Sequence, residues 1–455
     1  MPEWSNGAVS KTVVPTNRDR GFESLSLRIN KNNKIMSEIR PFRAYRPKKE
    51  NVKQTASRPY DVLNTQEARI ESKGNDMSFY HVIKPEMDFP DVHDHYAPEI
   101  YKSGKQAFDK LLAKGVVKRD DKPCMYLYKL VMDGHTQKGL VACCSIDDYF
   151  NNVIKKHELT RPDKEEDRKN HVRYSKINYE PVFFAYPHLQ AVDHLVDHAT
   201  SSIPEYDFTS DDGIQHTLWV IDDDAVITKL VHLFRKEVPA IYVADGHHRT
   251  AAGALVGKEM RDADLHPSGN KGYNYFMAVL FPDNQLQIID YNRVVKDLNG
   301  LAFEEFIDRI KNDFEITPCN ERYKPKTLHT IGMYLEEKWY ELKAKAHTYD
   351  DNDPVKSLDV TVLSDFILSP LFDIKNLRTD NRIGFIGGIR GLGELERLVD
   401  KGEWKIAFSM YPVSMQQLMS IADNDMIMPP KTTWFEPKLR SGLFVYGMDD
   451  THHEF

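Results

Sequence analysis

The chain has 455 residues, with 61 basic and 69 acidic side chains and a formal net charge of −8 at pH 7. This length allows two or three domains and a sizeable core. The acidic balance argues against a dedicated nucleic-acid binder, which usually carries a basic face, and no apolar run approaches the ~20 residues of a membrane span. Four cysteines without a CxxC pair exclude a zinc framework and a disulfide scaffold and favour small buried side chains in a reducing cytosol. We therefore expect a cytoplasmic protein.

The first 35 residues differ from the rest of the chain. They are polar, contain Pro15 and show no sustained hydrophobic period. The stretch GFES at 21–24 could be encoded by the invariant loop of a tRNA gene read in frame. Residues 1–35 are therefore interpreted as a spurious upstream extension before a true start at Met36, or alternatively as a disordered tail.

The first half of the chain after Met36 alternates between strand and helix patterns. Apolar alternation with period two indicates strands, and a period near 3.6 indicates helices. In chain order, the pattern predicts an edge strand at 39–46 broken by Pro41, a helix from Thr65 with that residue as N-cap, a loop at 75–100 and a helix at 97–114. It then predicts a hairpin of strands 125–132 and 140–146 with a longer loop, a helix at 147–157, and a second helix through Arg168 after an interruption at Pro162. A strand at 182–185, a helix at 189–200, strands near Tyr206 and at 216–221, and a helix at 223–235 follow.

The second half continues in the same mixed manner. It predicts a hairpin of strands 275–281 and 286–291, a helix at 303–314, and a hairpin of strands 330–335 and 339–343. Helices at 358–368, 392–400 and 414–422 then alternate with strands at 382–386 and 405–410, and an irregular segment at 428–438 precedes a last strand at 443–447. Interleaved strands and helices with many hairpins indicate a mixed α/β or α+β protein.

Between these halves lies the stretch that is richest in chemistry. Residues 240–244 read as a short buried strand, and helical spacing begins at Thr250. Between the strand and the helix lie an acid, a glycine, two histidines and an arginine: Asp245, Gly246, His247, His248 and Arg249.

This order suits phosphate binding. A helix N-terminus presents unpaired N–H groups and partial positive charge to an anion. Gly246 allows close backbone approach, Arg249 can bind phosphate oxygens with two donors, and Asp245 could hold a divalent cation. The alternative is an Asp N-cap followed by a charged first turn, which is common.

Three other groups of residues could carry chemistry. His157 and Glu158 do not continue into HExxH, which excludes the zinc-protease motif. His194 and His198 share one helix face at a spacing that suits a metal, but no third ligand is identifiable, and a surface helix is the favoured interpretation. The stretch PPKTT at 429–433 provides the phosphate-binding side chains Lys431, Thr432 and Thr433, with a polar loop as the alternative.

Four stretches, taken together, resemble one family. They are IRPFRAYRP at 39–47; HELT at 157–160 with Asp167 and Arg168; VADGHHR at 243–249; and MPPKTT at 428–433 with Phe435, Pro437, Lys438 and Gly442. The set is similar to the domain-of-unknown-function family ten-fifteen and covers 36–447. That family is in turn similar to the archaeal free serine kinases, which share the His-Glu, Asp-Gly-His-His-Arg and Pro-Lys-Thr-Thr stretches and belong to the ParB/sulfiredoxin nucleotide-binding superfamily.

The resemblance implies a ParB/sulfiredoxin-like nucleotide-binding core over 36–300, with large insertions, and a C-terminal α/β region over 301–455 that carries the Pro-Lys-Thr-Thr loop. It implies a kinase that transfers phosphate from ATP or ADP to an alcohol, with L-serine as the acceptor and O-phosphoserine as the product. Asp245 to Arg249 would bind the nucleotide phosphates and magnesium, with Asp245 holding the metal. Glu158 would be the catalytic base, Lys431, Thr432 and Thr433 would close the site, and His157 and Arg168 would support it.

The chain departs from this pattern in its length. About half of it has no counterpart in the kinase, and the interval between Glu158 and Asp245 is longer. The acceptor could therefore be another hydroxyl compound. The alternative function is a ParB-like nucleotide-binding switch or regulator without kinase activity, against which stand the net charge of −8 and the lack of a clear helix-turn-helix or basic arm. A sulfiredoxin-like reductase would need a cysteine in the phosphate turn, which has none.

Overall fold

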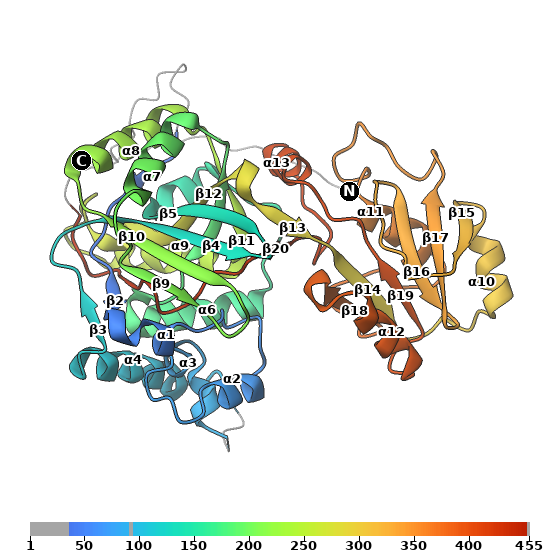
Figure 1. Ribbon diagram of the computed structural model, residues 1–455, viewed down its shortest axis with the longest axis horizontal. Helices are drawn as coiled ribbons and strands as arrows, with labels where there is room; N and C mark the ends of the chain where they lie inside the picture. The colour runs from blue at the N-terminus through green and yellow to red at the C-terminus, as the bar shows by residue number, and fades with distance from the viewer. Residues whose placement is uncertain (1–35, 91–93, 453–455) are drawn as a thin grey trace, which may run out of the picture. The chain divides into compact units, whose positions relative to one another are not determined.

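The larger of two main sheets contains the strand that ends at Asp245. The computed structural model describes residues 36–90 and 94–452, which belong to one compact unit, and the expectation for 1–35 lies outside the described residues. Neighbouring strands in this sheet follow the order β6 (Ile154–Lys155), β11 (Ile241–Asp245), β8 (Val182–Tyr186), β12 (Tyr275–Pro282), β5 (His135–Ser145), β4 (Met125–Met132), β10 (Gln215–Ile221) and β9 (Tyr206–Thr209), with β1 (Ile39–Arg40) also on β5. β8 is antiparallel to β11 but parallel to β12, so the sheet is mixed (Figure 1).

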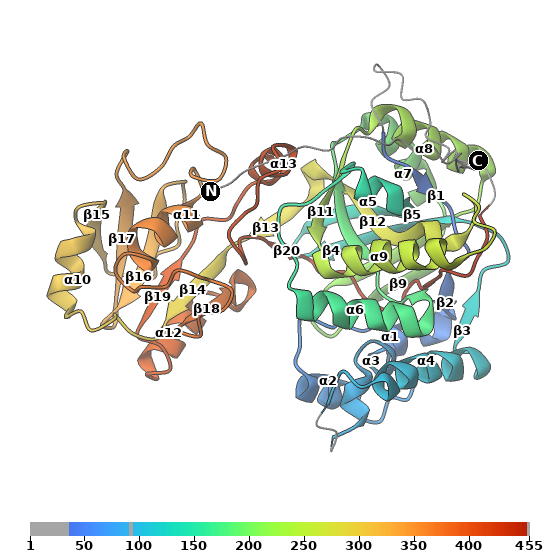
Figure 2. The same cartoon turned by 180° about the vertical axis from the view of Figure 1, so that it is seen from behind.

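Helices pack on this sheet. The central helix α9 (His247–Ala263) contacts β12 and β8 and lies against α6 (Pro162–Ser175) and α5 (Ile146–Phe150), as Figure 2 shows for α6 and α9. Small residues permit this close packing, because a Cβ added at Gly257 would lie 2.3 Å from the Tyr273 carbonyl oxygen. The amphipathic helices α7 (Gln190–Thr200) and α8 (Asp224–Glu237) pack on each other, and α8 also contacts β1.

Short helices before β4 form a further layer. They are η1 (Lys49–Asn51), α1 (Val52–Thr55), α2 (Thr65–Glu71), α3 (Tyr80–Ile83), η2 (Pro85–Asp88) and α4 (Pro98–Ala113). The longest, α4, begins with Pro98 in its first turn and packs on α3 and α6. Two small pairings tie this layer to the rest, β2 (Tyr45–Pro47) with β3 (Val117–Arg119) and β7 (Ile177–Asn178) with β21 (Tyr446–Gly447).

A second, antiparallel sheet is built from the later part of the chain. Its order is β15 (Phe314–Cys319), β17 (Lys338–Ala344), β16 (Thr330–Leu335), β19 (Ile406–Ser409), β14 (Tyr291–Val295) and β18 (Ile383–Gly387). Helix α12 (Leu392–Asp400) packs on β16 and β19. The remaining elements of this part are α10 (Phe303–Ile310), α11 (Asp359–Leu363) with the π-helical turn Ser364–Leu368, the short turn Gly388–Arg390 and α13 (Met415–Asp423).

One predicted hairpin does not form, because the chain passes from the first sheet to the second after β12. β13 (Gln287–Ile289) does not pair with β12 but runs antiparallel to β20 (Trp434–Glu436), and the next strand, β14, joins the second sheet. After Pro282 the chain therefore leaves the first sheet, and it returns through β20 (Figure 1). A turn-like Pro-Asp-Asn sequence shows that the chain bends but does not show which strand it then meets. The predicted division at residues 300 and 301 stays a prediction.

The mixed α/β class is confirmed, and several element boundaries are corrected. The hairpin of β4 and β5 has a tight turn at Asp133-Gly134, where both residues have positive φ (51° and 80°), instead of a long loop. Helix α2 is capped by Asn64 rather than Thr65, through a capping box with Glu67. Pro162 begins α6 instead of interrupting a helix, as its missing N–H allows at a first helical turn.

Three further corrections concern irregular regions. The predicted loop at 75–100 contains α3 and η2, because buried apolar side chains such as Val82 and Met87 hold short turns in place. The predicted helix at 147–157 ends at Phe150 and gives way to β6, and the helix predicted at 303–314 ends at Ile310 before β15. None of the helices in the described part of the chain is long and apolar enough to cross a membrane.

Candidate functional site

The turn between β11 and α9 forms the base of the site. Gly246 has φ 89° and is the N-cap of α9, which begins at His247, three residues earlier than the spacing predicted. Its carbonyl accepts hydrogen bonds from the backbone N–H and hydroxyl of Thr250, at 2.8 and 3.0 Å. A Cβ at this position would lie 3.1 Å from the Arg249 guanidinium. The positive φ and the close guanidinium both favour glycine here, and the alternative of an Asp N-cap is wrong.

Asp245 is held by two buried cations. Its Oδ2 accepts a hydrogen bond from Lys438 Nζ at 2.9 Å and lies 3.9 Å from an Arg249 nitrogen, and its Oδ1 accepts from the Gly246 N–H. Burial raises the pKa of the Asp245 carboxyl, but the charges of Lys438 and Arg249 outweigh burial and hold that pKa well below its usual range. Asp245 is therefore ionised at neutral pH.

Arg249 points into the protein rather than into open space. Its guanidinium donates to the Pro181 carbonyl at 3.0 Å and lies 6.0 Å from the Tyr60 ring centre. Its side chain is only 9% exposed, and its Nε has no hydrogen-bond partner. In this conformation Arg249 neutralises Asp245 and is not extended toward a ligand as a phosphate fork.

A cavity of about 650 Å³ opens beside this turn. Its lining includes one catalytic candidate and several basic groups, namely Glu158, His248, Lys431, Arg168 and Arg378, together with the Tyr60 ring. Arg168 pairs with Asp167 at 2.8 Å, and its guanidinium lies 4.0 Å from the centre of the Tyr60 ring. The volume is in the range of small-molecule and cofactor sites.

Neighbouring groups shift the pKa values of two basic residues of the cavity, Lys431 and His248. Burial opposes the charge of Lys431, but Tyr291, Glu158 and Asp61 outweigh this effect and raise its pKa. Burial lowers the pKa of His248, and the charge of Lys431 lowers it further. The Nε2 of His248 lies 3.0 Å from the Arg161 backbone N–H, which donates to it. The Lys431 side chain on the cavity wall is therefore protonated and positively charged, whereas His248 is neutral near pH 7.

Glu158 lies where two cavities meet. It lines both the large cavity and a smaller one of about 290 Å³, whose wall also includes Lys156 and His247. Burial raises the pKa of the Glu158 carboxyl, Lys431 opposes this shift, and the charge of Asp245 adds to it. A half-buried carboxylate with a raised pKa is a better proton acceptor than an exposed one.

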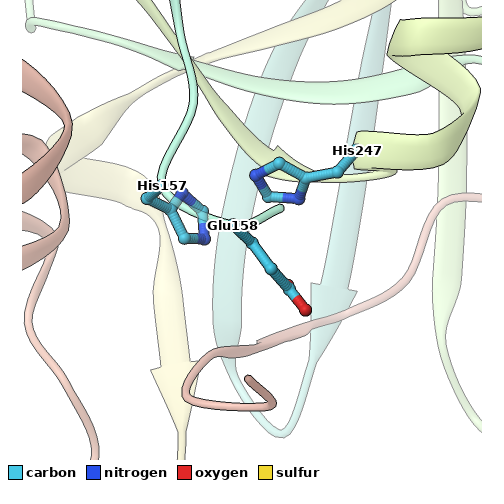
Figure 3. Close-up of side chains that lie close together, drawn as sticks. All are labelled: His157, Glu158 and His247. Atoms are coloured by element: carbon cyan, nitrogen blue, oxygen red, sulfur yellow. The ribbon is translucent and has the colours of Figure 1, made fainter. Parts of the chain in front are cut away.

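His157 and His247 form a buried pair next to Glu158. Their ring centres are 4.5 Å apart and nearly perpendicular, at 88° (Figure 3). Burial lowers the pKa of His157 to about 4, against the opposing charge of Asp245, and burial and the neighbouring His157 lower the pKa of His247 well below its usual value. Both rings are neutral at physiological pH, so neither adds positive charge to the site.

The structure brings together part of the predicted site. Glu158, His248, Arg168 and Lys431 line one cavity, although residues 158 and 431 are far apart in sequence. The two threonines do not join them among the described lining residues. The Thr432 hydroxyl donates to the Pro429 carbonyl at 2.6 Å and is buried, and Thr433 lies outside both cavities. The PPKTT segment therefore contributes its lysine to the cavity, while Thr432 shapes the turn.

Sequence reasoning missed three residues of this region. Lys438 forms an ion pair with Asp245, the Tyr60 ring makes a cation–π contact with Arg168, and Arg378 lies on the cavity wall. Lys438 lies in the fourth family stretch, so its membership there was a usable signal. Tyr60 and Arg378 lie in segments with no period or motif, and only the folded chain places them at the site.

Comparisons with known proteins give one family and several distant structures. A mutant free serine kinase in complex with AMP has 14% identity and a TM-score of 0.35, over 65% of this chain and 87% of that chain. Another mutant of free serine kinase, in complex with ADP, has 14% identity and a TM-score of 0.33, with the same coverage. A conserved hypothetical protein from Pyrococcus furiosus has 15% identity and a TM-score of 0.33, over 68% of this chain and 96% of that chain.

No curated protein matches the chain significantly. The family described as "Protein of unknown function (DUF1015)" matches residues 39–361. That match spans most of the chain and includes the turn at Asp245, the Glu158 segment and the strands that carry them. The chain therefore belongs to the DUF1015 family.

Proposed function

We propose that this protein is a nucleotide-dependent phosphotransferase that phosphorylates the hydroxyl group of a small molecule, with L-serine as the first acceptor to test. The observation that carries the proposal is the position of Glu158. It is a carboxylate with a raised pKa at the junction of a large cavity, lined by both basic and acidic side chains, and a smaller one. The large cavity would hold the nucleotide, and the smaller cavity, of about 290 Å³, would hold the acceptor.

Basic side chains on the wall of the large cavity support an anionic ligand, although Asp61, Glu86, Asp167 and Asp380 line it as well. Lys431, Arg168 and Arg378 contribute positive charge to its wall, and the N-terminus of α9 begins next to it. These groups would position the phosphates and neutralise the charge that develops during transfer, which is most of what phosphoryl transfer requires of a protein. The Tyr60 ring also lies on this wall, with the Arg168 guanidinium 4.0 Å from its centre.

The transfer would move one phosphoryl group from the nucleotide to the acceptor. The acceptor hydroxyl oxygen forms a bond to the terminal phosphorus of ATP or ADP, and the bond from that phosphorus to the bridging oxygen breaks. The hydroxyl proton passes to the Glu158 carboxylate and then to water. The products are the phosphorylated acceptor and the nucleotide shortened by one phosphate.

Magnesium would supply charge neutralisation at the phosphates. Asp245 is the carboxylate at the helix N-terminus that could hold it, and a carboxylate that is ionised at neutral pH suits a hard cation. Its present partner is the Lys438 ammonium, at 2.9 Å, so the ion would have to share or replace that contact.

The test is a transfer assay on the chain that starts at Met36. The protein is incubated with ATP or ADP, magnesium and L-serine, and O-phosphoserine is measured by mass spectrometry, with a second arm containing a mixture of other hydroxyl metabolites. We expect Glu158→Gln to lower kcat at least about a hundredfold while nucleotide affinity changes little, because general-base catalysis typically contributes 10²–10⁴-fold.

A matched control is Glu165→Gln, which removes a neighbouring carboxylate that bonds the Thr160 hydroxyl and does not line the cavity. This variant should keep full activity. Nucleotide binding without phosphorylation of any acceptor would refute the kinase and leave the nucleotide-binding switch. Loss of nucleotide binding in Glu158→Gln would assign Glu158 a structural role.

A further inference from the structure

Three side chains that can bind metal ions converge next to the large cavity. One ligand atom each of His157, Glu158 and His247 lies within 4.8 Å of the other two. Two of them follow β6, and the third opens α9 after the Gly246 turn. Figure 3 shows the two imidazole rings approaching each other beside the Glu158 side chain.

The two histidines lack the partners that buried polar groups normally have. His157 is 2% exposed and His247 is 9% exposed. Neither ring nitrogen of His157 has a hydrogen-bond partner, and neither does Nε2 of His247. An unpaired buried polar group destabilises the folded state, and most such groups in native proteins have a partner. Each neutral ring keeps one nitrogen with a lone pair, so the two rings can offer one lone pair each to a metal ion.

The donor set identifies the class of ligand. Two imidazoles and one carboxylate suit a first-row transition metal, such as Zn²⁺, rather than Mg²⁺, which prefers oxygen ligands and keeps several waters. A tetrahedral ion with bonds of about 2.0–2.1 Å needs its ligand atoms about 3.4 Å apart. The three atoms would therefore move inward by an ångström or so, and Glu158, as the half-buried member, has the freedom to do this.

We propose that His157, His247 and Glu158 form a binding site for one divalent transition-metal ion. Both Glu158 and His247 line the cavity of about 290 Å³, so the remaining coordination position faces that cavity and is open to water or a small ligand. The proposal goes beyond the phosphotransferase. It needs neither nucleotide nor acceptor, and its metal is distinct from magnesium at Asp245. With the ion bound, the Glu158 carboxylate is a ligand, so it can accept the acceptor's proton only in the metal-free protein.

The experiment measures metal binding by the protein alone. The chain is stripped with a chelator, dialysed and titrated with ZnCl₂ by calorimetry, and a second sample is loaded with Co²⁺ and its d–d absorption is recorded. We expect one equivalent of tightly bound Zn²⁺ and a Co²⁺ spectrum typical of four or five ligands. His157→Gln and His247→Asn should each weaken binding at least about a hundredfold, since loss of an outer-shell partner alone costs 10–100-fold.

The matched control is the double variant His194→Ala/His198→Ala, which removes the histidine pair spaced four residues apart on α7 and should bind Zn²⁺ like the original chain. The site is overturned if the original chain binds no Zn²⁺ more tightly than His157→Gln, or if the control loses binding to the same extent. The Co²⁺ spectrum tests the site even if a variant fails to fold, because a spectrum of hexa-aqua type in the original chain also refutes it. None of these readouts depends on phosphate transfer, so the two proposals can fail separately.

Discussion

The ion pair of Asp245 and Lys438 is expected to stabilise the fold as well as the site. At an Nζ–Oδ2 distance of 2.9 Å, an effective dielectric constant of about 20 gives a gross attraction of about 6 kcal/mol. Desolvation of both groups cancels part of it. Removal of one partner from a buried pair costs about 3–5 kcal/mol, and Asp245 is 27% exposed, so Asp245→Asn should cost about 3 kcal/mol. The variant also leaves Lys438 and Arg249 as neighbouring cations without their shared carboxylate.

A double-mutant cycle with Lys438→Met tests this reasoning. Unfolding is followed by urea titration and by thermal melting of Asp245→Asn, Lys438→Met and the double variant. We expect the double variant to be more stable than the sum of the single losses by about 2 kcal/mol, since it leaves no unpaired partner. Asp163→Asn is the surface control, because its partner Arg161 is half-exposed and the pair should contribute less than about 1 kcal/mol.

The pH dependence gives a second check on the same pair. The pKa of Asp245 is depressed in the folded state, so its stabilisation is present above the unfolded value near 3.9 and is lost as the pH falls below it. The stability gap between the original chain and Asp245→Asn should therefore narrow below about pH 4. Strictly additive single losses at pH 7, or an Asp245→Asn variant as stable as the original chain, would refute the account.

Three further predictions concern other parts of the molecule. Burial raises the pKa of Asp148 to about 7, so between about pH 4 and 7 the folded state binds a proton that the unfolded state has released. The free energy of unfolding should therefore fall by up to about 4 kcal/mol as the pH rises through this window. Asp148→Asn should flatten this part of the pH profile of stability in urea, and an unchanged profile would contradict the assignment. Gly257→Ala should lower the melting temperature although alanine favours helices by about 1 kcal/mol, because the added Cβ would meet the Tyr273 carbonyl at 2.3 Å; a more stable variant would show that this contact relaxes easily. Lys431→Met should weaken nucleotide binding at least about tenfold in calorimetry, through loss of a charged contact, whereas Thr433→Ala should leave it unchanged, and equal effects of the two would remove Lys431 from the phosphate site.

Local patterns were sufficient for the central unit of the fold. The strand at 241–245, the glycine turn and the helix after it follow from an apolar run, a residue that tolerates positive φ and alanine-rich helical spacing, all within about twenty neighbouring residues. The helix Leu392–Asp400 and the hairpin of β16 and β17 were predicted for the same reason. Short-range sterics and hydrogen bonding decide such elements, so the sequence alone reveals them.

Contacts between distant segments required the tertiary structure. Lys438 lies 193 residues from its partner Asp245, and β13 pairs with β20 instead of folding back on β12. The proximity of His157 to His247 depends equally on how β6 and β11 lie side by side. No local period encodes which strands and loops meet, because that choice minimises the free energy of the whole packed core. The sequence by itself therefore determined the strand, glycine turn and helix around Asp245 and the mixed α/β class, while only the folded chain decided which charges neutralise that turn and which residues line the cavity beside it.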